Sequence, residues 1–246
     1  DAFASLNVVD LKVQDDLTVT DDMTVGGTLG VTGVVTANAG VVVDNITIDG
    51  TEIDLSSGTL TIDAASITLD ASDSISTPTA GTSNVKLGVN AGNSIASGGN
   101  YNTVIGDEAG TALTTGDFNT AIGFEALKTE DAHGYNTAVG YQALKTQDAG
   151  ADAANTAVGY QAGLDITTGH SNVLMGASAG ANITDGDYNT FMGANTGLSV
   201  NTGVSNTLMG GLTGDALTGG NYNVALGQGS LTVDTNGNKS VAIGTF

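Results

Sequence analysis

The chain has 246 residues and a formal net charge of −21, because 26 Asp and Glu face five Lys and no Arg. A surface with this charge repels phosphate backbones, which argues against nucleic-acid binding. The absence of Cys excludes disulfides, thiolate metal ligands and a Cys nucleophile. With 40% hydrophobic residues, 37 Gly and 4% aromatic residues, the composition predicts a repetitive β-rich protein rather than a disordered chain or an ordinary globular enzyme.

The chain begins at Asp1 with no signal-peptide pattern and has no apolar run long enough to span a bilayer. It stops partway through a repeat, so we expect a segment of something longer or a processed product. We expect no membrane insertion.

Residues 1–75 carry a short apolar repeat. Apolar residues two apart recur every six residues, as in Leu11 with Val13, and later every seven, as in Ile46 with Ile48. Such alternation predicts strands. Because so short a unit cannot enclose a core, either one chain winds three units per coil or three chains share one core. The change of period favours a triple-stranded β-stalk.

The many Asp residues of this region fall at expected turns, and we interpret them as a solvated surface. Their spacing matches no EF-hand loop or calcium-binding nonapeptide, so no bound calcium is expected. Residues 76–83 contain the only proline, Pro78, and are predicted to be a linker or neck.

Residues 84–246 contain a second repeat, Asn-Thr-Ala-Ile/Val/Met-Gly, in ten copies. Its motif glycines are Gly88, Gly106, Gly123, Gly140, Gly159, Gly176, Gly193, Gly210, Gly227 and Gly244. The spacing is 17 residues except for one step of 18 and one of 19. A register this regular predicts a parallel β-roll of about ten coils, the last one truncated.

Each repeated position has a physical role. The residues one and three before the glycine, such as Ile122 and Thr120, share a strand face and are predicted to point into the coil. The motif glycine ends the strand at a tight turn. The Asn four before it recurs in nine coils: Asn84, Asn102, Asn119, Asn136, Asn155, Asn172, Asn189, Asn206 and Asn223. Stacking predicts a structural Asn ladder in which each amide hydrogen-bonds the next.

The residue two before the glycine is then expected on the outward face. It is usually Ala, but three consecutive coils carry Leu174, Phe191 and Leu208. An exposed row of this kind would promote aggregation, so we predict that it is covered as part of a trimer interface.

Aromatic residues also recur, five before the glycine as in Tyr101 and one after it as in Tyr141. Such rows either pack at coil corners or bind sugar rings, and packing is the simpler interpretation. The acidic pairs Glu125 with Glu130 and Asp107 with Glu108 raise a glycosidase hypothesis. They lie at variable loop positions where charges are usually solvated, so we expect no catalytic, cofactor-binding or metal site and no enzyme activity.

Two resemblances suggest a biological setting. The Asn-Thr-Ala-Val-Gly-Tyr-Gln-Ala-Leu unit at 136–144, repeated in part at 155–162, resembles repeats of tail-fibre and other virion fibre proteins of marine phages, especially cyanophages. The run at 17–33 looks like the stalk repeats of the same group. The segment 240–244, Ser-Val-Ala-Ile-Gly, is also similar to the head repeat of trimeric autotransporter adhesins, which form parallel β-rolls.

Together these observations predict an all-β, repetitive β-solenoid in a homotrimer, with a β-stalk followed by a β-roll. The resemblance implies a structural fibre on a virion surface that acts in host attachment. Its implied partners are other virion proteins and a host-surface receptor, with polysaccharide among the candidates. The alternative is a bacterial cell-surface adhesin or filament, and an enzyme on a β-helix is a third hypothesis that lacks a carboxylate pair breaking the repeat.

Overall fold

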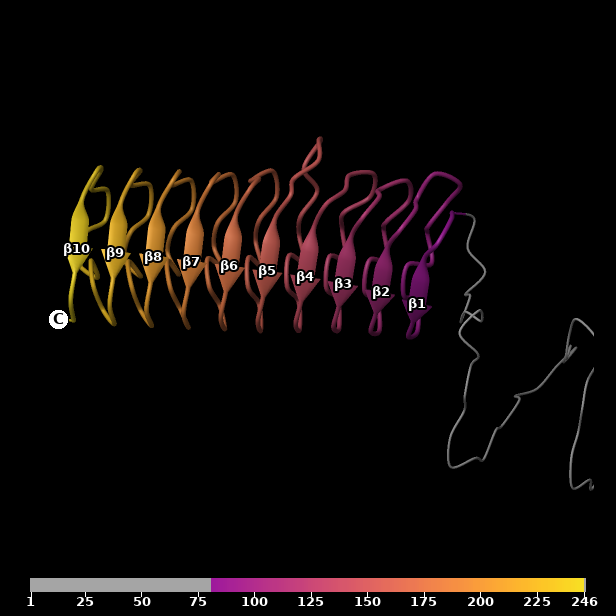
Figure 1. Ribbon diagram of the computed structural model, residues 1–246, viewed down its shortest axis with the longest axis horizontal. Helices are drawn as coiled ribbons and strands as arrows, with labels where there is room; N and C mark the ends of the chain where they lie inside the picture. Colours follow the sequence, from indigo (N-terminus) through magenta and orange to yellow (C-terminus); the bar gives the residue numbers. More distant parts are fainter. Residues whose placement is uncertain (1–80, 246) are drawn as a thin grey trace, which may run out of the picture. The chain divides into compact units, whose positions relative to one another are not determined.

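The structure is a computed structural model that describes residues 81–245. The predicted stalk at 1–75 and residues 76–80 of the predicted linker lie outside the described residues. Residues 81–245 form an all-β solenoid with one short strand per coil (Figure 1). This part of the chain contains no helix, and so no helix that could cross a membrane.

Ten strands of three residues stack in chain order into one parallel sheet. They are β1 (Val85–Leu87), β2 (Thr103–Ile105), β3 (Thr120–Ile122), β4 (Thr137–Val139), β5 (Thr156–Val158), β6 (Val173–Met175), β7 (Thr190–Met192), β8 (Thr207–Met209), β9 (Val224–Leu226) and β10 (Val241–Ile243). Equivalent residues pair across every step, as Thr120 of β3 does with Thr137 of β4. This register confirms the prediction of a parallel solenoid with coils of about 17 residues.

Two connections are longer than the rest. The step from β1 to β2 takes 18 residues and that from β4 to β5 takes 19, against 17 elsewhere. The β4–β5 connection rises above its neighbours in Figure 1. Since the strand register is unchanged on either side, the two extra residues are absorbed in the loop.

The strands point their middle residues into the coil, which contradicts the predicted orientation. Ala121 of β3 is fully buried, whereas Thr120 and Ile122 on either side of it are partly exposed. The pattern holds from β2 to β9, where each middle residue is buried. Because both faces of β2 to β9 carry uncharged residues that suit a strand, period-two alternation defines the two faces but not which one is inward.

The predicted trimer interface at Leu174, Phe191 and Leu208 is therefore wrong. All three side chains are completely buried within a single chain and belong to its hydrophobic core. They need no partner chain to cover them.

The size of the middle residue of a strand is related to the size of the residue four positions after the motif glycine of the same coil. Where the strand centre is Phe191, that position is Gly197, and a Cβ on Gly197 would overlap the Phe191 ring. Where the strand centre is the small Ala121, the same position holds the fully buried Leu127. Large and small residues thus exchange between two positions that fill the same interior space, as close packing requires. In the one coil with two small residues, Ala157 and Gly163, the space beside Gly163 is filled by Leu144, Ile166 and Leu174.

This exchange gives a stability prediction. Phe191→Ala should cost about 3–5 kcal/mol because it leaves a cavity. Adding Gly197→Leu should recover at least about 1 kcal/mol of that loss by filling the cavity, since Leu127 already occupies the equivalent site with a φ of 50° close to the 57° of Gly197. Denaturant unfolding of the two single variants and the double variant measures the coupling.

The control is Gly197→Leu alone, which should be strongly destabilising because Phe191 fills its space. Additive effects of the two substitutions would contradict the shared-space explanation.

Candidate functional site

The motif glycines adopt the conformation that the repeat predicted for them. All ten have φ between 118° and 142°, a region that side-chain-bearing residues rarely enter. Close stacking adds a second constraint, because a Cβ on Gly106 would lie 2.6 Å from the carbonyl oxygen of Gly123 in the next coil. Glycine is needed here both for the turn and for the approach of adjacent coils.

The nine predicted Asn residues form a continuous buried ladder between coils. Oδ1 of Asn172 accepts hydrogen bonds from the backbone N–H of Asn189 at 2.9 Å and from its Nδ2 at 3.1 Å. Nδ2 of Asn172 donates to the carbonyl oxygen of Gly186 at 2.8 Å. The Asn column is confirmed, and amide-to-amide bonds join its members from Asn155 to Asn223. The bond found at every step is instead donated by the backbone N–H of one Asn to Oδ1 of the preceding Asn, a contact the sequence analysis did not foresee.

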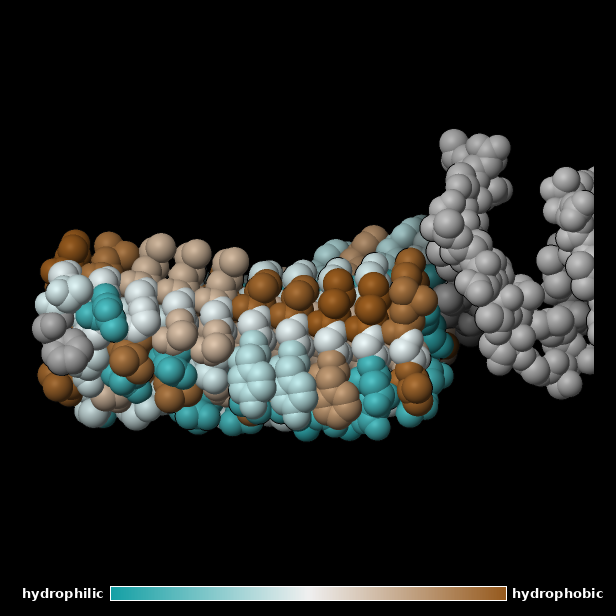
Figure 2. All heavy atoms as spheres, turned by 90° about the horizontal axis from the view of Figure 1, so that it is seen from below, coloured by the Kyte–Doolittle hydropathy of each residue, from teal (hydrophilic) through white to brown (hydrophobic). Residues whose placement is uncertain are grey.

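The outward side of the sheet forms a second extended feature. We call it the outer sheet face and define it as the first and third residues of β1 to β10. The first residues are Val or Thr and the third are Leu, Ile, Val or Met, so none of the twenty is charged. The third residues form the hydrophobic band along the rod in Figure 2.

The aromatic rows form stacks between coils. Phe124, Tyr141 and Tyr160 stack with ring centroids 5.3 Å and 5.2 Å apart and planes within 14° of parallel. Tyr101 and Phe118 stack in the same way in the other row, with centroids 5.0 Å apart. Neighbouring rings cover ring faces that a sugar would need, so this geometry favours packing at coil corners over a sugar platform.

The acidic pair Glu125 and Glu130 separates into two different environments. Glu125 Oε1 lies 2.7 Å from Lys128 Nζ, and its Oε2 lies 2.7 Å from both Lys145 Nζ and Gln142 Nε2. These hydrogen bonds, that from Lys128 first, lower the pKa of Glu125 to about 2. Lys128 also pairs with Glu108, and its carboxylate partners raise its pKa to about 12. Glu125 is a structural ion-pair centre.

Glu130 occupies a core position. The residue seven after the motif glycine is apolar and buried in the other coils between Ile95 and Leu217, but two adjacent coils carry Glu130 and Gln147, both fully buried. Gln147 Nε2 donates to Glu130 Oε2 at 3.1 Å. The expectation that Glu130 is solvated is therefore wrong. The signal was present in the sequence as two polar residues, Glu130 and Gln147, in a column that is apolar in the other coils from Ile95 to Leu217.

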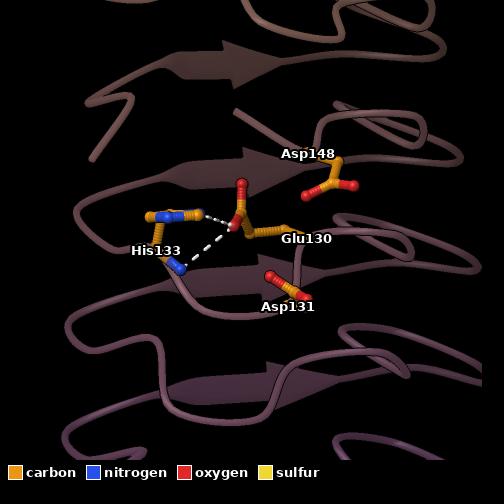
Figure 3. A group of neighbouring side chains, drawn as sticks. All are labelled: Glu130, Asp131, His133 and Asp148. Carbon is orange, nitrogen blue, oxygen red and sulfur yellow. Dashed lines mark hydrogen bonds and ion pairs between the residues drawn. The ribbon is translucent and has the colours of Figure 1, made fainter. Parts of the chain in front are cut away.

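Glu130 is the centre of a cluster with Asp131, His133 and Asp148 (Figure 3). His133 Nδ1 lies 3.0 Å from Glu130 Oε1, which also accepts the backbone N–H of His133 at 3.1 Å. One ligand atom from each of the four residues lies within 4.8 Å of the other three. The first three residues come from the β3–β4 connection and Asp148 from the longer β4–β5 connection. All four side chains carry atoms of the kind that ligate cations, and the sequence analysis expected no metal site here.

Comparisons with protein-family models, with curated proteins and with solved structures found no match for this chain. The functional conclusions therefore rest on the repeat and on the geometry described above.

Replacing one Asn of the ladder should lower the free energy of unfolding. Asn172→Ala leaves the buried N–H of Asn189 and the carbonyl of Gly186 without their partners, so we expect a loss of about 2–4 kcal/mol in unfolding free energy. Urea denaturation measures it. Asn182→Ala, at an exposed Asn, should cost less than about 0.5 kcal/mol, and equal losses would show that the ladder adds no stability.

The lowered pKa of Glu125 predicts a pH dependence. Because the folded-state pKa is about 2 and the ordinary value is 4.5, the ion pairs stabilise the fold above pH 4.5, and this contribution is lost as pH falls toward 2. Glu125→Gln should be less stable than the parent protein at pH 7, with the difference shrinking through that interval. Urea titrations at several pH values test this, and a difference that stays constant down to pH 2.5 would contradict it.

Proposed function

We propose that this protein is a non-enzymatic, homotrimeric fibre of a virus particle that acts in host attachment, with the described solenoid as a stiff segment of the fibre. The observation that carries the proposal is the outer sheet face. In a chain with a net charge of −21, twenty aligned positions on one face carry no charge at all. Charge is excluded where a protein surface is covered by another protein.

A second copy of this chain fits the outer sheet face in periodicity. Its rows repeat once per strand, so a copy aligned along the same axis would meet matching rows along its whole length. Ten strands at about 4.8 Å and three residues at about 3.3 Å give an outer sheet face of roughly 480 Å². That is less than the roughly 800 Å² that each partner buries in a standard interface, so the proposed trimer also needs contacts from residues beside this face. The interface belongs to these rows in place of Leu174, Phe191 and Leu208.

Stacked backbone hydrogen bonds support a mechanical role. Every coil from β1 to β10 is bonded to the next by strand pairing and by the Asn ladder, so bending the rod would break buried bonds. Loops on the outside of the rod offer surface to a host receptor. The proposal that the fibre belongs to a virus particle rests on the resemblance of 136–144 to phage fibre repeats.

An enzyme remains the less favoured function. The glycosidase hypothesis needs two carboxylates free to act on a substrate. Glu125 is held by Lys128 and Lys145, and Glu130 is fully buried against His133 and Gln147.

The oligomeric state tests the proposal. Light scattering or sedimentation should give three times the 24.2 kDa mass of one chain. Replacing Ile122 and Val158 of the outer sheet face together by Lys should raise the trimer dissociation constant by at least about a hundredfold, because the charges would be buried without partners.

The matched control is the double substitution of Asn93 and Asn182 by Lys, which adds the same charge at exposed positions on the connections. It should remain trimeric, and circular dichroism should show that all variants are folded. A parent protein that is a stable monomer would overturn the trimer and the interface.

The alternative of a bacterial surface adhesin is favoured by one observation, the similarity of 240–244 to the adhesin head repeat. The genes beside the one that encodes this chain distinguish the two settings. Capsid and tail genes would support the virus fibre, whereas a full gene with a secretion signal and a membrane anchor would support the adhesin.

A further inference from the structure

The Glu130 cluster has more negative charge than the fold around it balances. Three carboxylates surround one imidazole, with ligand atoms within 4.8 Å of one another (Figure 3). Like charges at this separation repel one another, and water screens the charges of the exposed Asp131 and Asp148. The nearby lysines do not relieve it, because Lys128 and Lys145 make their ion pairs with Glu108 and Glu125.

The carboxylates of the cluster differ in how firmly the fold holds them. Glu130 is fully buried and held by Gln147 Nε2 and by the backbone N–H of His133. Asp131 and Asp148 are exposed, and within residues 81–245 their carboxylates form no hydrogen bond or ion pair. A buried carboxylate thus lies beside two carboxylates that are free to rotate toward it.

The cluster lies where the repeat is broken in two ways. The buried apolar column becomes polar only at Glu130 and Gln147 among the coils from Ile95 to Leu217. The next connection, which carries Asp148, is the longest of the nine. A buried carboxylate in a coil interior is costly unless a bound cation or a well-placed partner compensates it.

We propose that Glu130, Asp131, His133 and Asp148 bind one divalent transition-metal ion, with Zn²⁺ the best match, and that the ion joins two consecutive coils. This site is independent of the fibre function. One imidazole nitrogen and three carboxylate oxygens form a four-ligand set that Zn²⁺ accepts. The imidazole disfavours Ca²⁺ and Mg²⁺, which prefer oxygen ligands alone.

The geometry needs little adjustment. Ligand atoms at about 2.0–2.1 Å from a tetrahedral ion lie about 3.3 Å apart. His133 Nδ1 and Glu130 Oε1 are already 3.0 Å apart, so the ion takes the place of the hydrogen-bonding proton between them. Rotation of the exposed Asp131 and Asp148 side chains closes the remaining distances. The ion then fixes the base of the β4–β5 connection to the preceding coil.

The test is calorimetric titration of the full chain, without an affinity tag and after chelator treatment, with Zn²⁺. One ion per chain should bind, and its binding should raise the thermal unfolding midpoint. His133→Gln and Asp148→Asn should each weaken binding by at least about tenfold. Glu130→Leu should abolish binding and still fold, because Leu113 occupies the same position one coil earlier.

His170→Gln is the matched control, since His170 is the other histidine of the described chain and also pairs with an acidic residue, Asp187. It should bind Zn²⁺ like the parent protein. Failure of the parent protein to bind Zn²⁺ would overturn the proposal. Equal affinity in the His133→Gln, Asp148→Asn and parent proteins would overturn it as well, and so would Ca²⁺ binding at least as tightly as Zn²⁺.

Discussion

The structure depends on one constraint, that every coil must stack on the previous one at the spacing of two hydrogen-bonded strands. Equivalent residues then lie about 4.8 Å apart and form columns along the rod. In the Asn ladder the repeats satisfy one another's hydrogen bonds, because the side-chain oxygen of each Asn accepts the backbone N–H of the Asn in the next coil. The motif glycines follow from the same constraint, since a Cβ at Gly106 or Gly176 would collide with the glycine above it.

Each coil is thin, so the volumes of its core side chains must match the small space inside it. Each coil contributes only a few side chains to the core, so a large residue in one column needs a small one in another. Phe191 with Gly197 and Ala121 with Leu127 are two solutions to the same requirement. Glu130 and Gln147 depart from it in polarity rather than size. They place a buried carboxylate and a buried amide where the flanking coils have Leu113 and Ile166, and burying these polar groups is costly unless they are partnered.

The distribution of charge separates the faces of the rod. In residues 81–246, 13 acidic residues face four Lys, a net charge of −9, yet none of these charges lies on the outer sheet face. Apart from Lys86 at the centre of β1, these charges all lie on the connections between strands. Electrostatic repulsion between copies is lowest at the outer sheet face, and apolar burial is most favourable there. The proposed fibre assembly through the outer sheet face rests on this distribution of charge.

The sequence by itself determined the solenoid, its 17-residue period, the turn glycines and the Asn column, because each of these repeats at a fixed spacing that local chemistry explains. It left open which strand face is inward, since Thr120 with Ile122 and Ala121 with its equivalents Leu174 and Phe191 all suit a strand. Only the tertiary structure decided that question, because the answer depends on how much volume Leu127 or Gly197 leaves inside the coil. It also brought Asp148 to Glu130, a contact between successive coils that no local pattern specifies.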